Sequence, residues 1–248
     1  MRRGPAASAP QAKDPPVTKI GIIGSGAIGA EVARLAVAGG IDVLIGNSRG
    51  PESLKELVDE LGPKAKAVTA AEAAQFGDLV VLAVPLGAYE ALPLEALRGR
   101  LILSTGNYYP FREGRIEALD SLSTTTAEYE QSLLPESTIV KAFNNIVAHH
   151  IPLLAHSTPR TALPVAGDDD EAKRASREVV EALGFDTVDA GSLAESWRFE
   201  PESGAYTGIY FAGGYEDYLK DPGAPLPADR LREFLAASHR PDVAAREF

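Results

Sequence analysis

Three glycines that follow a short apolar run near the start of the chain could bind a nucleotide. The segment IGIIGSGAIGAEVARLAVAGG, residues 20–40, holds Gly24, Gly26 and Gly29 in the pattern G-x-G-x-x-G. Between a strand and a helix, the first glycine permits the turn, the second lets a pyrophosphate approach the backbone, and the third lets helix and strand pack closely. The helix N-terminus then offers unpaired N–H groups to the phosphates. We expect a dinucleotide site here; a tight turn without a ligand is the alternative.

Polar residues after the second apolar run indicate which dinucleotide would bind. An NAD site places Asp or Glu there, against the ribose 2′-hydroxyl. This chain instead has Asn47, Ser48 and Arg49, and Arg49 lies twenty residues after Gly29. Amide, hydroxyl and guanidinium groups can bind a 2′-phosphate that a carboxylate would repel. The pattern favours NADP over NAD, whereas an ordinary polar loop is the alternative interpretation.

Alternating apolar runs and helical patterns must position these residues. The predicted strands cover residues 20–23, 41–46, 65–68, 78–85, 100–105, 137–145, 161–167 and 185–191. The predicted helices cover residues 28–38, 51–61, 69–76, 86–97, 127–134, 146–154, 168–184 and 228–237, and residues 106–126 read as a long polar loop. Repeated strand-helix-strand units imply right-handed crossovers, so we expect an α/β fold with a doubly wound parallel sheet.

Composition limits the compartment and the partners. The chain has 248 residues and no cysteine, so disulfides, thiolate metal sites and a cysteine nucleophile are excluded. No apolar run approaches the roughly 20 residues that a bilayer crossing requires. The first sixteen residues contain no apolar signal segment and read as a disordered tail, so we expect a cytoplasmic protein. The net charge of −11 opposes binding to nucleic acids and anionic membranes.

Other residues that could do chemistry carry weaker signals. His149, His150 and His156 lack the spacing of a zinc site, so solvated or packing histidines are expected and no metal is predicted. The acidic run 168–171 is explained as a helix start that suits the dipole. A group of aromatic residues could form a small core or could wall a flat ring: Trp197, Phe199, Tyr206, Tyr210, Phe211, Tyr215 and Tyr218. No acid–base dyad is evident, so no catalytic residue is identified.

Several quoted motifs, taken together, resemble one family. They are GIIGSGAIG, NSR, VLAVP, VKAFNN, VAGDDDEAKR and VDAGSLAESWR. In this order and spacing, over residues 19–198, they resemble the NADP-dependent oxidoreductases that include the deazaflavin (coenzyme F420):NADP oxidoreductases. The resemblance implies a Rossmann domain that binds NADP(H) over residues 18–194, with a short strand-helix extension. A disordered tail, residues 1–17, would precede it, and an irregular C-terminal tail, residues 195–248, would follow as a possible cover for the acceptor side.

The resemblance also assigns residues to the cofactor by position. The pyrophosphate would contact Gly24, Ser25, Gly26, Ala27, Ile28 and Gly29. The 2′-phosphate would contact Asn47, Ser48 and Arg49. Ala83, Val84 and Pro85 would line the cofactor, and Asn107, Ala142, Phe143 and Asn144 would lie near the nicotinamide.

Two classes of function fit these expectations. The first is an NADPH-dependent enzyme that transfers hydride to a flat acceptor such as a deazaflavin (coenzyme F420), or to a flavin, quinone or imine. Direct transfer between two bound rings needs proximity and orientation more than a dedicated acid or base. The second is an NADP(H)-binding redox sensor without turnover. An open, aromatic-walled pocket would favour the enzyme, and a filled pocket would favour the sensor. Relatives suggest a homodimer.

Overall fold

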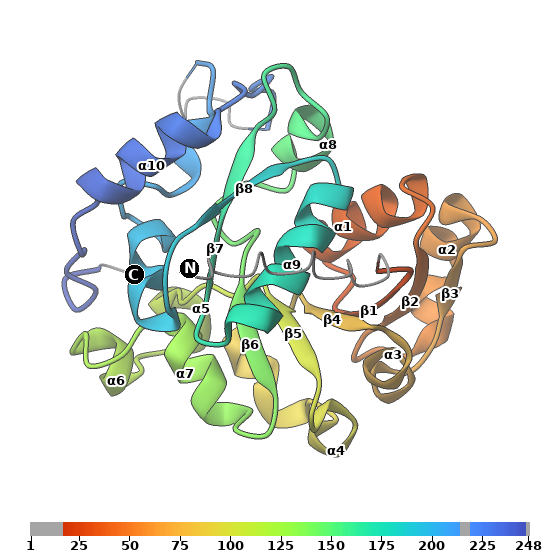
Figure 1. Ribbon diagram of the computed structural model, residues 1–248. Coiled ribbons are helices and arrows are strands. Elements are labelled where there is room, and N and C mark those ends of the chain that lie inside the picture. The colour runs from red at the N-terminus through yellow and green to blue at the C-terminus, as the bar shows by residue number, and fades with distance from the viewer. Residues whose placement is uncertain (1–16, 214–218, 247–248) are drawn as a thin grey trace, which may run out of the picture.

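Eight strands form one sheet in the order β3-β2-β1-β4-β5-β6-β7-β8 (Figure 1). The computed structural model describes residues 17–213 and 219–246. The strands are β1 (Lys19–Ile23), β2 (Asp42–Gly46), β3 (Ala65–Ala67), β4 (Leu79–Leu82), β5 (Leu101–Ser104), β6 (Thr138–Lys141), β7 (Ala162–Gly167) and β8 (Asp186–Asp189). All neighbouring strands are parallel except β6 and β7, which pair antiparallel. The doubly wound, Rossmann-type fold expected from the sequence is confirmed, and β7 and β8 form its extension.

Helices connect the strands along the chain. The α-helices are α1 (Ala27–Ala38), α2 (Lys55–Leu61), α3 (Ala70–Phe76), α4 (Leu94–Leu97), α5 (Pro110–Glu113), α6 (Glu117–Asp120), α7 (Thr126–Leu133), α8 (His150–Leu154), α9 (Asp170–Ala182) and α10 (Ala228–Ala237). The 3-10 helices are η1 (Pro51–Leu54), η2 (Leu86–Ala91), η3 (Leu193–Phe199) and η4 (Thr207–Tyr210). In the described part of the chain, none of these helices has the length and apolar character that a membrane crossing needs. The expected disordered tail, residues 1–16, lies outside the described residues.

The sheet carries an apolar core on each face. In β4, Leu79 and Val81 belong to the larger core, while Val80 and Leu82 belong to the smaller one. Successive side chains of a strand point to opposite faces, so a strand that is apolar throughout is buried on both sides. Helices α1, α8, α9 and α10 contribute to the larger core, and α3, α4, α6 and α7 contribute to the smaller one. The central strands are therefore held rigidly between two layers of helices.

Several predicted segments differ from the structure, among them the strand predicted over residues 137–145, which ends at Lys141. The helix predicted over residues 86–97 is broken into η2 and α4, because Pro93 has no N–H to continue it. The helix predicted over residues 146–154 shrinks to α8, since the preceding residues form an irregular loop that begins at Phe143, whose φ of 60° is left-handed. The segment 106–126, predicted as a loop, contains the short helices α5 and α6. Each difference follows from local geometry that hydrophobic periodicity does not report.

The C-terminal residues are part of the main core. Phe199, Tyr210 and Leu231 are fully buried within the larger apolar cluster. The Tyr210 hydroxyl donates to the carbonyl of Ala162 in β7 at 2.9 Å. Helix α10 packs against β7 and β8. Removal of the whole segment would expose the core, so point substitutions are the better probes of its role.

We expect Leu231→Ala to lower the free energy of unfolding by about 2–5 kcal/mol, the usual cost of truncating a buried leucine. Urea unfolding followed by circular dichroism measures this. The neighbouring exposed residue provides the control, because Arg232→Ala should change stability by no more than about 0.5 kcal/mol. Equal effects of the two substitutions would show that α10 does not pack as described.

Candidate functional site

A cavity of about 590 Å³ lies at the carboxyl ends of the central strands. Its walls are formed by Gly26, Ala27, Ile28, Ala83, Val84, Pro85, Thr105, Gly106, Asn107, Tyr109, Arg112, Phe143, Asn144, Ile146, Val147, Ala148, Tyr206 and Thr207. These residues follow β1, β4, β5 and β6, with two more from the C-terminal segment. In doubly wound sheets, ligands bind outside the carboxyl ends of the strands. The cavity is therefore in the place where this fold binds its ligands.

The three glycines of the first loop have three different surroundings. Gly24 has a φ of 108°, and a Cβ there would lie 2.2 Å from the carbonyl oxygen of Ala83. A Cβ on Gly29 would lie 2.0 Å from the carbonyl oxygen of Gly24. A Cβ on Gly26 would meet no protein atom within 4 Å, and Gly26 lines the cavity. The first and third glycines are thus required by the fold, whereas the second leaves the backbone open to a ligand.

The start of α1 is suited to an anion. Gly26 is the N-cap of this helix and has an extended backbone. The first turn contains no acidic residue, so no carboxylate offsets the partial positive charge of the helix N-terminus. A helix N-terminus beside an open glycine is a place where phosphate can approach backbone N–H groups. The residues present therefore fit the pyrophosphate of a dinucleotide.

The polar residues after β2 lie beside this loop, outside the cavity walls. The Asn47 amide nitrogen donates to the Ser25 hydroxyl at 2.9 Å, and the Asn47 side-chain oxygen accepts from the backbone N–H of Arg49 at 2.9 Å. Ser48 and Arg49 are exposed. Within residues 17–213 and 219–246, the Arg49 guanidinium makes no ion pair with a carboxylate. Asn47 thus fixes the turn that presents Arg49 to solvent next to the glycine loop.

The structure separates the predicted cofactor residues into three groups. Those that line the cavity are Gly26, Ala27, Ile28, Ala83, Val84, Pro85, Asn107, Phe143 and Asn144. Gly24, Gly29 and Ala142 are buried beneath its walls, where they serve packing and backbone shape. Asn47, Ser48 and Arg49 form the turn after β2, and Asn47 joins this turn to Ser25 of the glycine loop. The described residues are therefore consistent with one elongated site.

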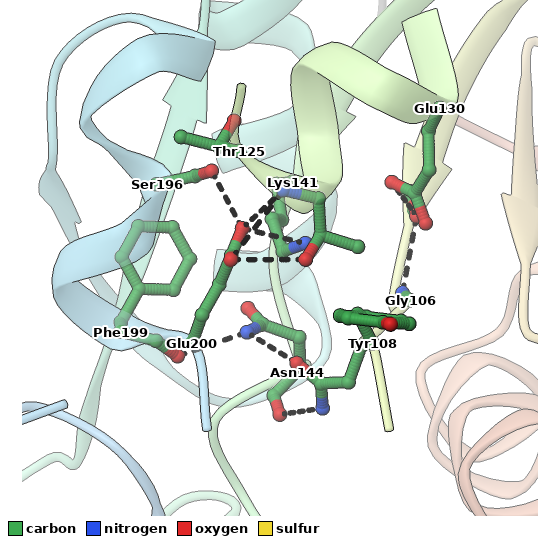
Figure 2. A network of polar contacts seen from close by, with 12 residues as sticks. Gly106, Tyr108, Thr125, Glu130, Lys141, Asn144, Ser196, Phe199 and Glu200 are labelled. Atoms are coloured by element: carbon green, nitrogen blue, oxygen red, sulfur yellow. Dashed lines mark hydrogen bonds and ion pairs between the residues drawn. The ribbon is translucent and has the colours of Figure 1, made fainter. Parts of the chain in front are cut away.

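Asn144 and Asn145 hold the C-terminal segment against this site. The Asn144 side-chain nitrogen donates to the Asn107 side-chain oxygen at 3.1 Å and to the carbonyl of Phe199 at 2.9 Å (Figure 2). In return, the Asn107 side-chain nitrogen donates to the Asn144 carbonyl at 2.8 Å. The Asn145 side-chain nitrogen donates to the Ala205 carbonyl at 3.0 Å. The side-chain amides of Asn144 and Asn145 therefore make structural contacts within the protein.

A buried ion pair lies behind these loops. Lys141, the last residue of β6, is 0% exposed, and its Nζ is 3.3 Å from Oε1 of Glu200. The Glu200 carboxylate also accepts hydrogen bonds from the hydroxyls of Thr126 and Ser196, each at 2.9 Å (Figure 2). Buried charges need this kind of compensation because removal from water is costly. Glu200 therefore connects β6, α7 and η3 at the edge of the site.

Glu130 supports the loop after β5 from below. The Ser104 hydroxyl donates to Oε2 of Glu130 at 2.8 Å and accepts from the backbone N–H of Gly106 at 3.1 Å (Figure 2). Burial raises the pKa of the Glu130 carboxyl, and the charge of Lys141 opposes this rise. Burial and the neighbouring Glu130 also raise the pKa of the Tyr89 phenol well above its ordinary value. This polar cluster fixes Gly106 in the cavity wall.

Tyr109 and Arg112 are among the residues of the cavity wall that sequence reasoning missed, and the role of Tyr206 was left open. The hydroxyls of Tyr109 and Tyr206 are hydrogen-bonded to each other, and the Arg112 guanidinium lies 5.0 Å from the centre of the Tyr109 ring. A signal for Tyr109 was present, because YYP comes directly after β5 and loops at the carboxyl ends of strands build such sites. Tyr206 belongs to an irregular segment with no comparable signal.

The predicted aromatic group divides between the core and the surface hollows. Phe199 and Tyr210 are core residues, while Trp197 lines a small separate cavity of about 20 Å³. A second hollow of about 830 Å³ adjoins the first, with Tyr109, Tyr206 and Thr207 shared between them. It is lined further by Phe111, Pro201, Glu202, Ser203, Gly204, Gly208, Ile209, Phe211 and Phe234. Tyr215 and Tyr218 lie outside the described residues.

The histidines and the acidic run have structural contacts. Nε2 of His149 and of His150 lie 3.0 Å and 3.2 Å from the Asp221 carbonyl oxygen. Burial lowers the pKa of His150, and Asp221 opposes this. The Asp169 carboxylate accepts from the Ala172 N–H at 2.7 Å and so caps α9. Among the described residues, no group of three potential ligands could hold a metal ion.

The fold is of the Rossmann type, with a cavity at the carboxyl ends of its strands, and comparison with known proteins points to one family of this fold. Residues 19–108 match the family described as NADP oxidoreductase, coenzyme F420-dependent. A solved structure of a hypothetical protein from Sinorhizobium meliloti is 32% identical, with a TM-score of 0.62, and the match covers 72% of this chain and 87% of that one. The chain belongs to this family of coenzyme F420-dependent NADP oxidoreductases.

Two further relatives carry names that state a type of reductase. A candidate F420-dependent NADP reductase from Arthrobacter sp. FB24 is 25% identical, with a TM-score of 0.61, over 73% of this chain and 87% of that one. Metalloreductase STEAP3 of Rattus norvegicus is 33% identical over 184 residues, which make up 73% of this chain and 36% of that protein. This chain thus spans about a third of the length of the rat relative.

We expect Gly26→Val to abolish NADPH binding while the fold survives. A Cβ on Gly26 would meet no protein atom within 4 Å, so the new side chain would fill the space that the pyrophosphate needs without disturbing its neighbours. Fluorescence titration with NADPH measures binding, and circular dichroism measures folding. Gly87→Val is the matched control, since a Cβ on Gly87 also meets no atom within 4 Å but Gly87 lies outside the cavity walls. Normal NADPH binding by a folded Gly26→Val protein would show that the glycines serve only the turn.

We expect the wild-type protein to bind NADPH at least about tenfold more tightly than NADH, and Arg49→Ala to remove most of that preference. A hydrogen bond to a charged phosphate is worth about 1.5–3 kcal/mol, and tenfold requires only about 1.4 kcal/mol. Parallel titrations with the two cofactors test this, with Arg232→Ala as a distant charge control. Equal affinities in the wild-type protein would contradict the assignment of Asn47, Ser48 and Arg49.

Proposed function

We propose that this chain is an NADPH-dependent oxidoreductase that transfers hydride between NADP(H) and a flat ring acceptor such as a deazaflavin. The observation that carries the proposal is the lining of the cavity. It contains both the open backbone at Gly26 with the start of α1 and the aromatic side chains of Tyr109 and Tyr206. An anion-binding element and aromatic side chains in one cavity suit a dinucleotide whose nicotinamide faces a second ring.

The residues of the chain would provide binding, orientation and exclusion of water. When bound, NADPH would supply the hydride. Phe143 is fully buried, and its ring packs edge-on against Phe185 at 5.6 Å between centres, so it anchors the loop after β6 in the core. The Asn107 and Asn144 amides hold the two neighbouring loops in place. A fixed geometry of this kind lowers the entropic cost of bringing two rings together.

The acceptor side is supported by the second hollow and by the relatives. Its walls include Phe111, Phe211 and Phe234, and it continues from the cofactor cavity past Tyr109 and Tyr206. A planar, partly apolar molecule fits such walls better than a small polar substrate. The family description and the Arthrobacter relative point to a deazaflavin, and the rat relative points to a metal-reducing system. The open, aromatic-lined cavity favours an enzyme over a redox sensor without turnover.

We expect NADPH oxidation when the NADPH complex is mixed in a stopped-flow instrument with 5-deazariboflavin, and slower oxidation with FMN, menadione or ferric EDTA. The ring acceptors can stack on the aromatic side chains of the cavity, whereas ferric EDTA has no ring system that could stack there. Absorbance at the NADPH band and at the acceptor band gives both rates. Tight NADPH binding with no transfer to any of the four acceptors would favour the sensor.

A further inference from the structure

We propose that the hydrogen-bonded phenols of Tyr206 and Tyr109 deliver the proton that a ring acceptor must gain with the hydride. The proposal rests on the proposed function, because it concerns the same cavity and the same reaction. Tyr206 belongs to the C-terminal segment and Tyr109 to the loop after β5. Both side chains line the cofactor cavity and the adjoining aromatic hollow.

The reaction requires this proton for balance. Hydride transfer breaks the C4–H bond of NADPH and gives the acceptor one hydrogen nucleus and two electrons. The acceptor ring then carries an extra negative charge at a nitrogen or oxygen atom. A phenol O–H bond breaks, an H–N or H–O bond forms on the acceptor, and the phenolate recovers its proton from solvent through the second phenol. The sum is NADPH plus acceptor plus one proton, giving NADP⁺ and the reduced acceptor.

The hydrogen bonds around Tyr206 single it out as the direct donor. Its oxygen accepts a hydrogen bond from the Asn107 side-chain nitrogen at 3.3 Å and lies within hydrogen-bond distance of the Tyr109 hydroxyl. Both neighbours can therefore donate to the phenolate that remains after proton transfer, and hydrogen bonds to a charged form favour it. Asn107 is itself held by the Asn144 carbonyl at 2.8 Å, so the donor geometry is fixed.

Tyr109 is placed to return the proton. Its ring packs against the Arg112 guanidinium and against Phe111, with 5.4 Å between the two ring centres. Its backbone N–H donates to Glu113 at 3.1 Å, and Glu113 also accepts from Arg112. Phe111 and Arg112 are exposed, so this loop borders solvent. Tyr109 thus connects the Tyr206 phenol to a loop that borders water.

The test is single-turnover reduction of 5-deazariboflavin, FMN and menadione by the NADPH complex, in H₂O and in D₂O. General acid catalysis contributes roughly 10²–10⁴-fold, so Tyr206→Phe should slow transfer about 100-fold. Tyr109→Phe should slow transfer less. The wild-type reaction should be slower in D₂O, and Tyr206→Phe should remove that difference. NADPH affinity should stay within about threefold of wild type, since the phenols do not touch the phosphate end.

Tyr129→Phe is the control, because Tyr129 lies on α7 outside both hollows and should retain the wild-type rate. Wild-type rates and an unchanged D₂O effect in both phenol variants would overturn the proposal while leaving the proposed function intact. A parallel loss of NADPH affinity and rate, with the D₂O effect retained, would also overturn it and assign the phenols to wall structure. A wild-type protein that reduces none of the acceptors would remove the proposed function and this inference together.

Discussion

The candidate site depends on an ion pair that compensates the buried charge of Lys141. Lys141 ends β6 with no exposure to solvent, and the carboxylate that faces it, Glu200, belongs to a segment about sixty residues further along the chain. Removing one partner of a buried ion pair usually costs about 3–5 kcal/mol, because the other charge is left uncompensated. Tyr206 and Thr207, the cavity residues from the C-terminal segment, follow Glu200 closely. Pairing this lysine therefore helps to place Tyr206 and Thr207 in the cavity wall.

The sequence was sufficient where short-range constraints decide the structure. The strand, the glycine turn and the start of α1 lie within ten residues of sequence. The spacing of Gly24, Gly26 and Gly29 therefore predicts both the turn and the open backbone at Gly26. The buried parallel strands read as continuous apolar runs, as β4 shows, and they led to the correct fold class. The end of β2 likewise placed Asn47 beside the glycine loop, where the structure shows it bonded to Ser25.

The parts that escaped prediction depend on contacts between distant residues. The hydroxyl of Tyr206 meets that of Tyr109 across 97 positions of sequence, and no local pattern encodes such a pairing. The antiparallel pairing of β6 and β7 is another long-range outcome. The break between η2 and α4 could have been predicted, because Pro93 is evident in the sequence. The hydrophobic periodicity of residues 86–97 was given too much weight there. Asn144 was predicted to lie near the nicotinamide; it lines the cavity, and its amide nitrogen contacts protein groups there.

The amides of Asn144 and Asn145 have a consequence for how the molecule fluctuates. They bond carbonyls of the C-terminal segment, so local opening of that segment breaks the same contacts that shape the loop after β6. Two regions that share their hydrogen bonds open together as one cooperative unit. A ligand that binds only the closed arrangement then protects both regions by mass action. Amide hydrogen exchange around Ala205 would therefore report whether a ligand occupies the pocket, although the phosphates of the ligand would not contact this region.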